Sequence, residues 1–331
     1  MIDLTAENQT NAQIKSGVEN TAKDRRETVK DDSAMTTSNM ERGPIGIAVV
    51  DKEPGWTSHD AVARCRRIFG QRRVGHAGTL DPDASGILLI GVGRATRLLR
   101  FLTALPKTYE AEVVFGTATS TLDASGEVTG EWDMDYLRIE DVRLAATQLT
   151  GDIDQVPPMV SAVKVGGKPL YKLARQGLDI PRQPRPVSVY RFDITEAISP
   201  GVFKIEVECS SGTYVRVLAS DLGELLNGGA HLRSLRRTRI GSFCESDAKR
   251  LDELDASALL SPAEGLRDLD SVVVDSEIVN LIARGLPLDR VPVGASGDGP
   301  WALLDTLGQL LAVYEATDSD RITPAVVLSG H

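Results

Sequence analysis

The sequence predicts an α+β fold, in which a mixed, mainly antiparallel sheet is flanked by helices and loops and is followed by a small β-rich unit. Short apolar runs of strand length are dispersed among helical patterns, without the regular strand–helix alternation of a parallel α/β sheet. From about residue 265 onward, the apolar runs 272–274, 301–304 and 310–314 are separated by Gly- and Pro-rich turns, which is typical of a small β module. The length of 331 residues also favours two domains over one.

The folded part of the chain is expected to follow a polar tail. Residues 1–44 lack a sustained apolar period, so we expect them to be disordered. The run 45–50 has the length and composition of a strand. Ser58 precedes a helical pattern of apolar residues and is the expected N-cap. We expect a main domain over 45–250 and the small domain over 265–331.

The other elements of the main domain follow from the same patterns. Continuous apolar runs predict buried strands, alternating runs predict half-exposed strands, and apolar residues three and four apart predict helices. In order, we expect a strand at 86–93, a short helix at 95–102, an antiparallel strand at 109–116, a polar loop at 117–130, a helix near 138–149, strands at 187–194 and 202–209 paired as a hairpin, an amphipathic helix at 215–226, and a strand after the basic segment around Arg236.

The net charge of −10 is unevenly distributed, and for nucleic-acid binding its distribution matters more than its total. Residues 251–331 carry 4 basic and 14 acidic residues, whereas residues 160–191 carry 7 basic residues and 1 acidic residue. Two further basic clusters lie at 64–73 and 233–239. Each basic segment could neutralise RNA phosphates, and ordinary solvated surface charges are the alternative.

Cysteine content and hydropathy exclude several classes of protein. The three cysteines are far apart and odd in number, which predicts reduced thiols rather than a disulfide framework or a metal site. No apolar run approaches the roughly 18 residues that cross a bilayer, and the N-terminus lacks the features of a signal peptide. We therefore expect a cytoplasmic protein that does not associate with membranes.

The segment 75–82 is the candidate site. It places two glycines, a histidine, a threonine, an aspartate and a proline between predicted elements, and loops of this kind position functional groups. Taken alone, Asp81-Pro82 could also be a simple turn. The chain lacks the motifs of Ser-His-Asp hydrolases, zinc proteases, P-loop NTPases and dinucleotide-binding enzymes. A carboxylate reaction on nucleic acid, without a cofactor or a metal, is the class that remains.

Seven segments of the main domain form a more specific pattern. They are DKEPGWTSHD (51–60), GHAGTLDPDASG (75–86), KTY (107–109), PPMVSAVK (157–164), YKLARQG (171–177), GTYVR (212–216) and GAHL (229–232). In this order and spacing they resemble the bacterial tRNA pseudouridine-55 synthases of the TruB family. Chance explains one short match easily, but it does not explain the whole series.

The resemblance implies a pseudouridine synthase fold with a PUA-like C-terminal domain. It also implies a reaction in which the uracil N1–C1′ bond breaks, the held base turns, and C5 bonds to C1′. Asp81 would be the catalytic carboxylate and Arg216 the cation that keeps it ionised. Tyr109 would be the aromatic that stacks on the flipped-out base and could help to remove the C5 proton. The ordinary alternatives are a surface charge for Arg216 and a core aromatic for Tyr109.

The resemblance further implies which residues contact the flipped base. His76 is expected to take part in base flipping by occupying the space that the base leaves. Tyr214 and Leu235 are expected to line the base pocket, and core packing is their alternative. Arg97 matches a position that is usually basic, and a solvated helix charge is equally consistent with it.

The basic segment 157–190 matches a mobile thumb that closes on the T-arm of tRNA in this family. Lys164 and Lys168 would contact phosphates there. The acidic C-terminal domain departs most from the family, so we expect it to contribute less to RNA binding.

Three functions remain to be weighed. The first is an enzyme that isomerises a T-loop uridine. The second is a tRNA-binding or tRNA-folding module without catalysis, and the third is a guide-dependent synthase inside a ribonucleoprotein. The intact Asp81, Tyr109 and Arg216 and the short acidic C-terminus favour the first. We expect tRNA as its partner, no obligate protein partner, and a monomer.

Overall fold

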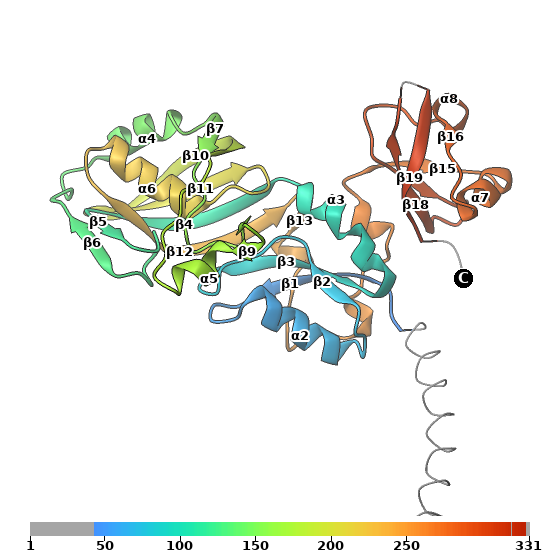
Figure 1. Cartoon of the computed structure of the whole chain (residues 1–331), viewed down its shortest axis with the longest axis horizontal. Helices are drawn as coiled ribbons and strands as arrows, with labels where there is room; N and C mark the ends of the chain where they lie inside the picture. Colours follow the sequence, from blue (N-terminus) through green and yellow to red (C-terminus); the bar gives the residue numbers. More distant parts are fainter. Residues whose placement is uncertain (1–42, 319, 329–331) are drawn as a thin grey trace, which may run out of the picture.

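A computed structural model describes residues 43–318 and 320–328. The prediction of a disordered tail therefore lies almost wholly outside the described residues. The described chain forms a large sheet within residues 46–250 and a smaller sheet within residues 270–327 (Figure 1). The predicted combination of a mixed sheet, flanking helices and a C-terminal β-rich unit is confirmed.

The large sheet has ten strands, most of which pair antiparallel. The order is β14-β1-β3-β12-β4-β11-β10-β7, with β2 paired to β3 and β13 paired to β12. Only the pairs β1–β14 and β12–β3 within it are parallel. Its strands are β1 (Gly46–Lys52), β2 (Val74–His76), β3 (Ser85–Val92), β4 (Lys107–Phe115), β7 (Gly151–Gln155), β10 (Arg185–Ser199), β11 (Val202–Cys209), β12 (Ala230–Ile240), β13 (Phe243–Cys244) and β14 (Lys249–Arg250).

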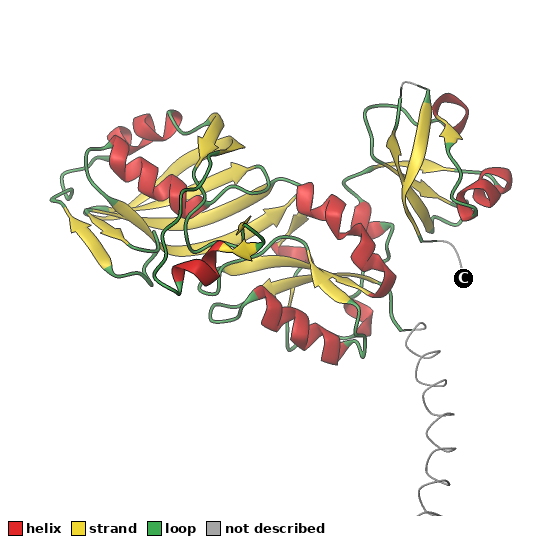
Figure 2. Ribbon diagram, in the orientation of Figure 1, coloured by secondary structure: helices red, strands yellow, loops and turns green. Residues whose placement is uncertain are grey.

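Helices pack against the large sheet and bury its apolar side chains. Figure 2 shows α4 and α6 side by side over one half of the sheet, where their apolar residues share a core with β4, β10 and β11. No helix in the described ranges is long and apolar enough to span a membrane. The helices of this part are α2 (Ser58–Ile68), η1 (Gly93–Leu98), α3 (Leu99–Ala104), α4 (Ile139–Thr147), α5 (Leu170–Ala174), α6 (Val215–Leu225), η2 (Glu245–Asp247), η3 (Ala256–Ala258) and η4 (Glu264–Leu266).

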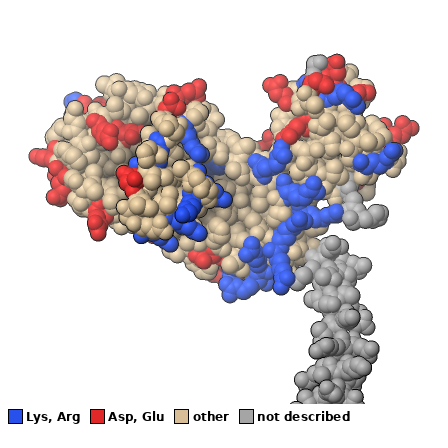
Figure 3. All heavy atoms as spheres, viewed as in Figure 1, with Lys and Arg blue, Asp and Glu red and all other residues tan. Residues whose placement is uncertain are grey.

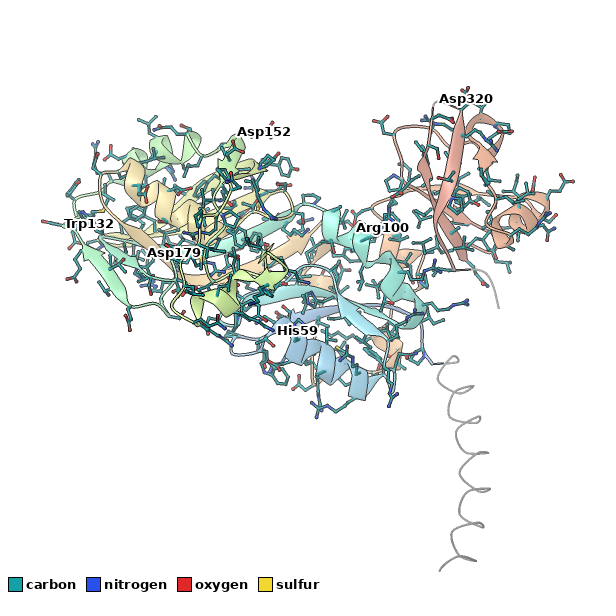
Figure 4. The ribbon with its side chains drawn as sticks, in the orientation of Figure 1. His59, Arg100, Trp132, Asp152, Asp179 and Asp320 are labelled. Carbon is teal, nitrogen blue, oxygen red and sulfur yellow. The ribbon has the colours of Figure 1, made fainter. Side chains whose placement is uncertain are left out.

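The smaller sheet is attached to the rest of the chain through α3 and its preceding turn. Apolar residues of this sheet, among them Val313 and Val326, share a core with Leu98 and Phe101. Arg100, labelled in Figure 4, lies between the two parts and pairs with Glu315. The strand order is β15-β17-β18-β19-β16, and the elements are β15 (Asp270–Val273), α7 (Ser276–Ala283), β16 (Leu288–Asp289), α8 (Arg290–Val293), β17 (Trp301–Leu304), β18 (Leu310–Ala316) and β19 (Arg321–Val327).

Two short hairpins stand apart from both sheets. One consists of β5 (Thr117–Thr119) and β6 (Val128–Glu131), where the sequence predicted only a polar loop, so that prediction was wrong in part. The other consists of β8 (Lys164–Val165) and β9 (Lys168–Pro169) and belongs to the thumb. These strands are short and mostly polar, so their sequences lack the apolar alternation by which a strand is predicted.

The predicted N-cap of α2 was wrong by one residue. Thr57 caps the helix, because its side chain accepts from the Asp60 backbone N–H while the Asp60 carboxylate accepts from the Thr57 N–H at 3.0 Å. This reciprocal pair is a capping box. The Ser58 hydroxyl instead accepts from the Leu80 N–H at 2.9 Å and so ties α2 to the segment that precedes Asp81.

Both edges of the large sheet are short and charged. At one edge, β14 contributes only Lys249 and Arg250. At the other edge, β7 has the sequence GDIDQ, and Asp152 marks this edge in Figure 4. The sequence did not predict β7, since a polar five-residue strand resembles a loop.

Lys52 fastens the end of β1 to the loop that follows Asp81. Its side chain is fully buried, and its ammonium donates to the carbonyl oxygens of Glu53, Trp56 and Pro82 at 3.0, 2.7 and 3.1 Å. Burial lowers the pKa of Lys52 to about 8, with Asp83 and Asp81 opposing the shift. Three backbone carbonyls thus depend on one ammonium group.

We expect Lys52→Met to lower the free energy of unfolding by about 3 kcal/mol, because the apolar stem is kept while three acceptors lose their donor. Urea denaturation measures the change. Lys249→Met, at an exposed position of β14, is the matched control and should stay within about 0.5 kcal/mol of the parent. Equal stability of the two variants would contradict this account of the loop.

Candidate active site

Asp81 lies in the loop between β2 and β3, and this loop is fixed from several sides. The Ser58 hydroxyl donates to the Leu80 carbonyl at 3.1 Å, and Lys52 holds the Pro82 carbonyl. Within the loop, the Ala84 N–H donates to the Asp81 carbonyl at 3.2 Å. The carboxylate of Asp81 is therefore presented by a rigid turn, as a reacting group requires.

Arg216 supplies the cation for this carboxylate. It lies in the first turn of α6 and is only 4% exposed, so the alternative of a surface charge is wrong. Its Nη2 lies 3.0 Å from an Asp81 carboxylate oxygen and donates to the Val160 carbonyl at 2.9 Å. One planar group thus links the predicted catalytic carboxylate to the start of the thumb.

Asp123 is a second carboxylate on Arg216, and the sequence analysis missed it. Its Oδ2 lies 3.5 Å from Arg216 Nη1. Its Oδ1 accepts from the Thr121 hydroxyl at 2.6 Å and from the Ser125 backbone N–H at 3.1 Å. Leu122, immediately before it, has a positive φ of 64°, a left-handed conformation that non-glycine residues rarely adopt. The signal was a Thr-x-Asp-x-Ser pattern in a polar loop, which is indistinguishable from an ordinary turn.

Opposing influences act on the pKa of Asp81. Its recessed position raises the pKa, the Arg216 guanidinium lowers it, and the carboxylates of Asp123 and Asp83 raise it again. About 40% of the Asp81 side chain is still exposed, so the group faces open space rather than protein alone. The net direction is upward. Burial and the neighbouring carboxylates thus favour the protonated form of Asp81, and the ion pair with Arg216 favours the ionised form.

Two cavities meet at Asp81 and Arg216. The smaller, about 250 Å³, is lined by Tyr109, Tyr214 and Leu235, as the resemblance predicted for a base pocket. Tyr109 is 8% exposed, and burial raises the pKa of its phenol. The larger, about 430 Å³, is lined by Asp123, Ser125, Val160 and Arg233 among others. The structure thus brings Asp81, Arg216, Tyr109, Tyr214 and Leu235 together.

Arg237 is a further buried cation beside the smaller cavity. It is 1% exposed, and its Nε donates to the Ile87 carbonyl at 2.7 Å. Gly86 has a positive φ of 102°, and a Cβ there would lie 2.2 Å from the Arg237 carbonyl oxygen, so β3 and β12 approach closely only because this residue is glycine. The conformation places the Asp81 loop against β12.

Three of the four arginines of the basic cluster 233–239 are buried or paired with carboxylates, whereas Arg239 is exposed. Arg237 is buried, Arg233 pairs with Glu112 at 2.7 Å, and Arg236 pairs with Asp51 at 2.9 Å. The cluster lies inside β12 rather than before a strand, which corrects the predicted position of the strand.

The structure also shows where the other predicted RNA contacts lie. His76 is half-buried on β2, with its ring edge-on to His59 at a centroid distance of 5.8 Å, and burial followed by the nearby His59 lowers the pKa of His76. Arg97 donates to the Val327 carbonyl at 2.6 Å and so contacts the smaller sheet. Lys164 and Lys168 are exposed on the hairpin β8–β9.

Basic and acidic side chains gather on different parts of the surface. In Figure 3, Lys and Arg gather over the middle of the visible face, from the thumb toward the region below the smaller sheet. Asp and Glu are concentrated at the far end of the large sheet and around the smaller sheet. The thumb and its surroundings are therefore the part of this face that suits a polyanion.

Comparisons with known proteins identify relatives over most of the chain. The family model described as TruB family pseudouridylate synthase (N terminal domain) matches residues 66–215, and that described as tRNA pseudouridylate synthase B C-terminal domain matches residues 216–279. A protein of Mycobacteroides abscessus named tRNA pseudouridine synthase B is 43% identical over 295 residues, which cover 86% of this chain and 96% of that protein. A protein of Symbiobacterium thermophilum with the same name is 48% identical over 246 residues, covering 73% and 82%.

Among solved structures, a Cbf5–Nop10–Gar1 complex contains a similar chain. The TM-score is 0.65 at 26% sequence identity, and the match covers 85% of this chain and 83% of that one. The similarity thus covers most of the length of both chains.

We expect the pKa of Asp81 to rise further in Arg216→Met, because the nearest cation is removed, and to fall in Asp83→Asn, because a neighbouring carboxylate is removed. Carbon NMR of the labelled Asp81 carboxylate across an acid titration measures both shifts. Opposite directions for the two variants are the expected result. If the pKa of Asp81 moved in the same direction in both variants, changes in structure rather than in charge would control it.

Proposed function

Because the chain belongs to the TruB family of tRNA pseudouridine synthases, it isomerises uridine in tRNA, and we propose that its target is uridine 55 in the T-loop. The observation that carries this proposal is the position of Asp81, which is paired with a buried arginine and faces a cavity walled by aromatic side chains. A carboxylate held in this way suits a reaction that breaks and remakes a glycosidic bond without a metal.

We propose that Asp81 is the catalytic carboxylate and that Arg216 keeps it ionised and oriented. As the N1–C1′ bond of the uridine breaks, Asp81 either bonds to the nucleoside or stabilises the developing positive charge. The base then turns within the cavity and C5 bonds to C1′, which releases any bond to Asp81. The proton on C5 is lost and N1 takes up a proton, so the product is an isomer of the uridine. Because the acid form of Asp81 cannot play either role, the Arg216 ion pair is essential to the proposal.

We propose that Tyr109 stacks on the uracil, with Tyr214 and Leu235 forming the rest of the pocket. A base inside the tRNA fold must be flipped out to reach such a cavity. His76, half-buried at the end of β2, is proposed to occupy the space that the base leaves. Burial raises the pKa of the Tyr109 phenol, so the ring that stacks on the base is neutral. Tyr109 is further proposed to help remove the proton from C5.

The thumb, residues 157–190, is proposed to close over the T-arm. Its exposed lysines Lys164 and Lys168 suit contact with phosphates, and Val160 at its start already contacts Arg216. Arg97 stays a proposed RNA contact, although its guanidinium also joins the smaller sheet. The acidic C-terminal unit is proposed to be PUA-like and to contribute less to RNA affinity.

We further propose that the protein acts in the cytoplasm, as a monomer, without an obligate protein partner. Its relatives in bacteria are named for an activity on tRNA, and the Cbf5 chain that it resembles lies in a complex with Nop10 and Gar1. The short acidic C-terminal unit supports independent action, and light scattering of the purified protein checks the mass. A tRNA-folding module without catalysis is the alternative. A folding role can also accompany the enzyme activity, because binding and releasing tRNA need not require catalysis.

We expect Asp81→Asn to bind tRNA with unchanged affinity and to form no pseudouridine, because the amide keeps the size of the side chain but cannot act as a carboxylate. Tritium release from tRNA labelled at uracil C5 measures turnover. Asp154→Asn, on the outer strand β7, is the control and should retain full activity. Normal turnover by Asp81→Asn would overturn the assignment, and would leave only the RNA-binding alternative for this loop.

We expect the double variant Lys164→Ala and Lys168→Ala to weaken tRNA binding and to flatten its salt dependence. Each lost phosphate contact reduces the slope of log affinity against log salt by about 0.7 to 0.9. Filter binding at several salt concentrations measures the slope. Lys249→Ala, on the far edge of the sheet, is the control. An unchanged slope would exclude both lysines from the RNA interface.

A further inference from the structure

Two polar atoms beside Asp81 have no hydrogen-bond partner. Within the described ranges, four buried side-chain nitrogen or oxygen atoms lack one, and two of these are Ser161 Oγ and Arg216 Nε. Ser161 is 6% exposed and Arg216 is 4% exposed. Buried polar groups in proteins are nearly always paired, so an unpaired one requires a specific explanation.

Both residues line the smaller cavity with Asp81, Tyr109 and Leu235. Their backbones are held in place: the Ser161 carbonyl accepts from the Tyr171 N–H at 3.0 Å, and the preceding carbonyl of Val160 accepts from Arg216. A serine side chain can nevertheless turn between three staggered positions. The hydroxyl is thus carried to the cavity by a fixed backbone while its own direction is free to follow a ligand.

The two groups together suit an oxygen acceptor. The Nε–H of arginine can only donate, and a serine hydroxyl can donate one hydrogen bond. A uracil ring presents two carbonyl oxygens, O2 and O4, whereas cytosine presents an amino group in place of O4. A site that donates to a substrate oxygen rejects an analogue without it, because the donors of the site are then left unpaired.

Building on the proposed function, we propose that Ser161, which lines the same cavity as Arg216, is a specificity-determining substrate-binding residue whose hydroxyl donates a hydrogen bond to a carbonyl oxygen of the flipped-out uracil. Ser161, at the beginning of the thumb, then binds the base itself, while Lys164 and Lys168 contact the phosphates of the RNA. Because the Val160 carbonyl already accepts from Arg216, Ser161 is held at the cavity without a further movement of this part of the thumb.

The test combines a protein variant with substituted RNA. Synthetic T-arm stem-loops carry uridine, 2-thiouridine or 4-thiouridine at the target, because sulfur is a poor hydrogen-bond acceptor. Single-turnover rates of pseudouridine formation are measured by nucleoside chromatography for the parent, Ser161→Ala and Ser161→Thr. With uridine, Ser161→Ala should be about tenfold slower, which corresponds to about 1.4 kcal/mol, and Ser161→Thr, which keeps the hydroxyl, should recover most of the rate.

The decisive result is the loss of the Ser161→Ala effect with one of the two thio-substituted RNAs, which also identifies the contacted oxygen. An equal effect on all three RNAs would indicate a structural role and overturn the proposal, as would an unchanged rate with uridine. A fourth RNA with 2′-deoxyuridine tests the sugar, and loss of the effect with that RNA alone would assign the contact to the ribose instead.

Two controls separate this contact from other causes. Ser271→Ala, at an exposed position of β15, should react like the parent with every RNA, and equal melting temperatures exclude a folding defect. A parent enzyme that converts none of the RNAs would overturn the proposed T-loop target, and this contact with it. An active parent without coupling between Ser161 and the base would overturn the contact alone.

Discussion

The interaction on which the site depends is the buried guanidinium of Arg216. It starts from α6 and reaches Asp81 after β2, Asp123 between β5 and β6, and Val160 at the start of the thumb. Its two Nη nitrogens hold these three partners, which lose their orientation if the guanidinium moves. Because the guanidinium is planar and rigid, the positions of these segments are mutually constrained. Asp81, the proposed catalytic carboxylate, and the first residues of the thumb thus share one hydrogen-bonding group.

Much of the fold could be predicted from the sequence where burial leaves a pattern. Continuous apolar runs make up most of β1 and β3, and α6 shows a clear helical period, so each was predicted close to its observed limits. The polar strand β7 and the hairpin β5–β6 gave no such pattern, because backbone pairing alone defines them. The N-cap of α2 was displaced to Thr57 because a tertiary contact to Leu80 uses the hydroxyl of Ser58.

The candidate site shows the same division between local and tertiary information. Asp81, Tyr109 and Arg216 were found through motifs whose order and spacing resemble a family, and the structure places them around one cavity. Asp123 was not singled out, since a threonine-rich turn carries no local signal, and Ser161 was noted only as part of the segment 157–164. Their importance depends on burial next to Arg216, which only the folded chain creates. The run of basic residues in β12 suggested a phosphate-binding surface, but Arg237 within it is a core residue.

The charged edges of the large sheet bear on how the protein behaves at high concentration. An exposed strand edge can pair with a strand of another chain and begin aggregation. On β7, Asp152 and Asp154 would bring four carboxylates together if two copies met edge to edge, and on β14 only Lys249 and Arg250 are available for pairing. Like charges oppose each such encounter. The acidic composition that hides β7 from sequence patterns thus protects the sheet against growing from one molecule into the next.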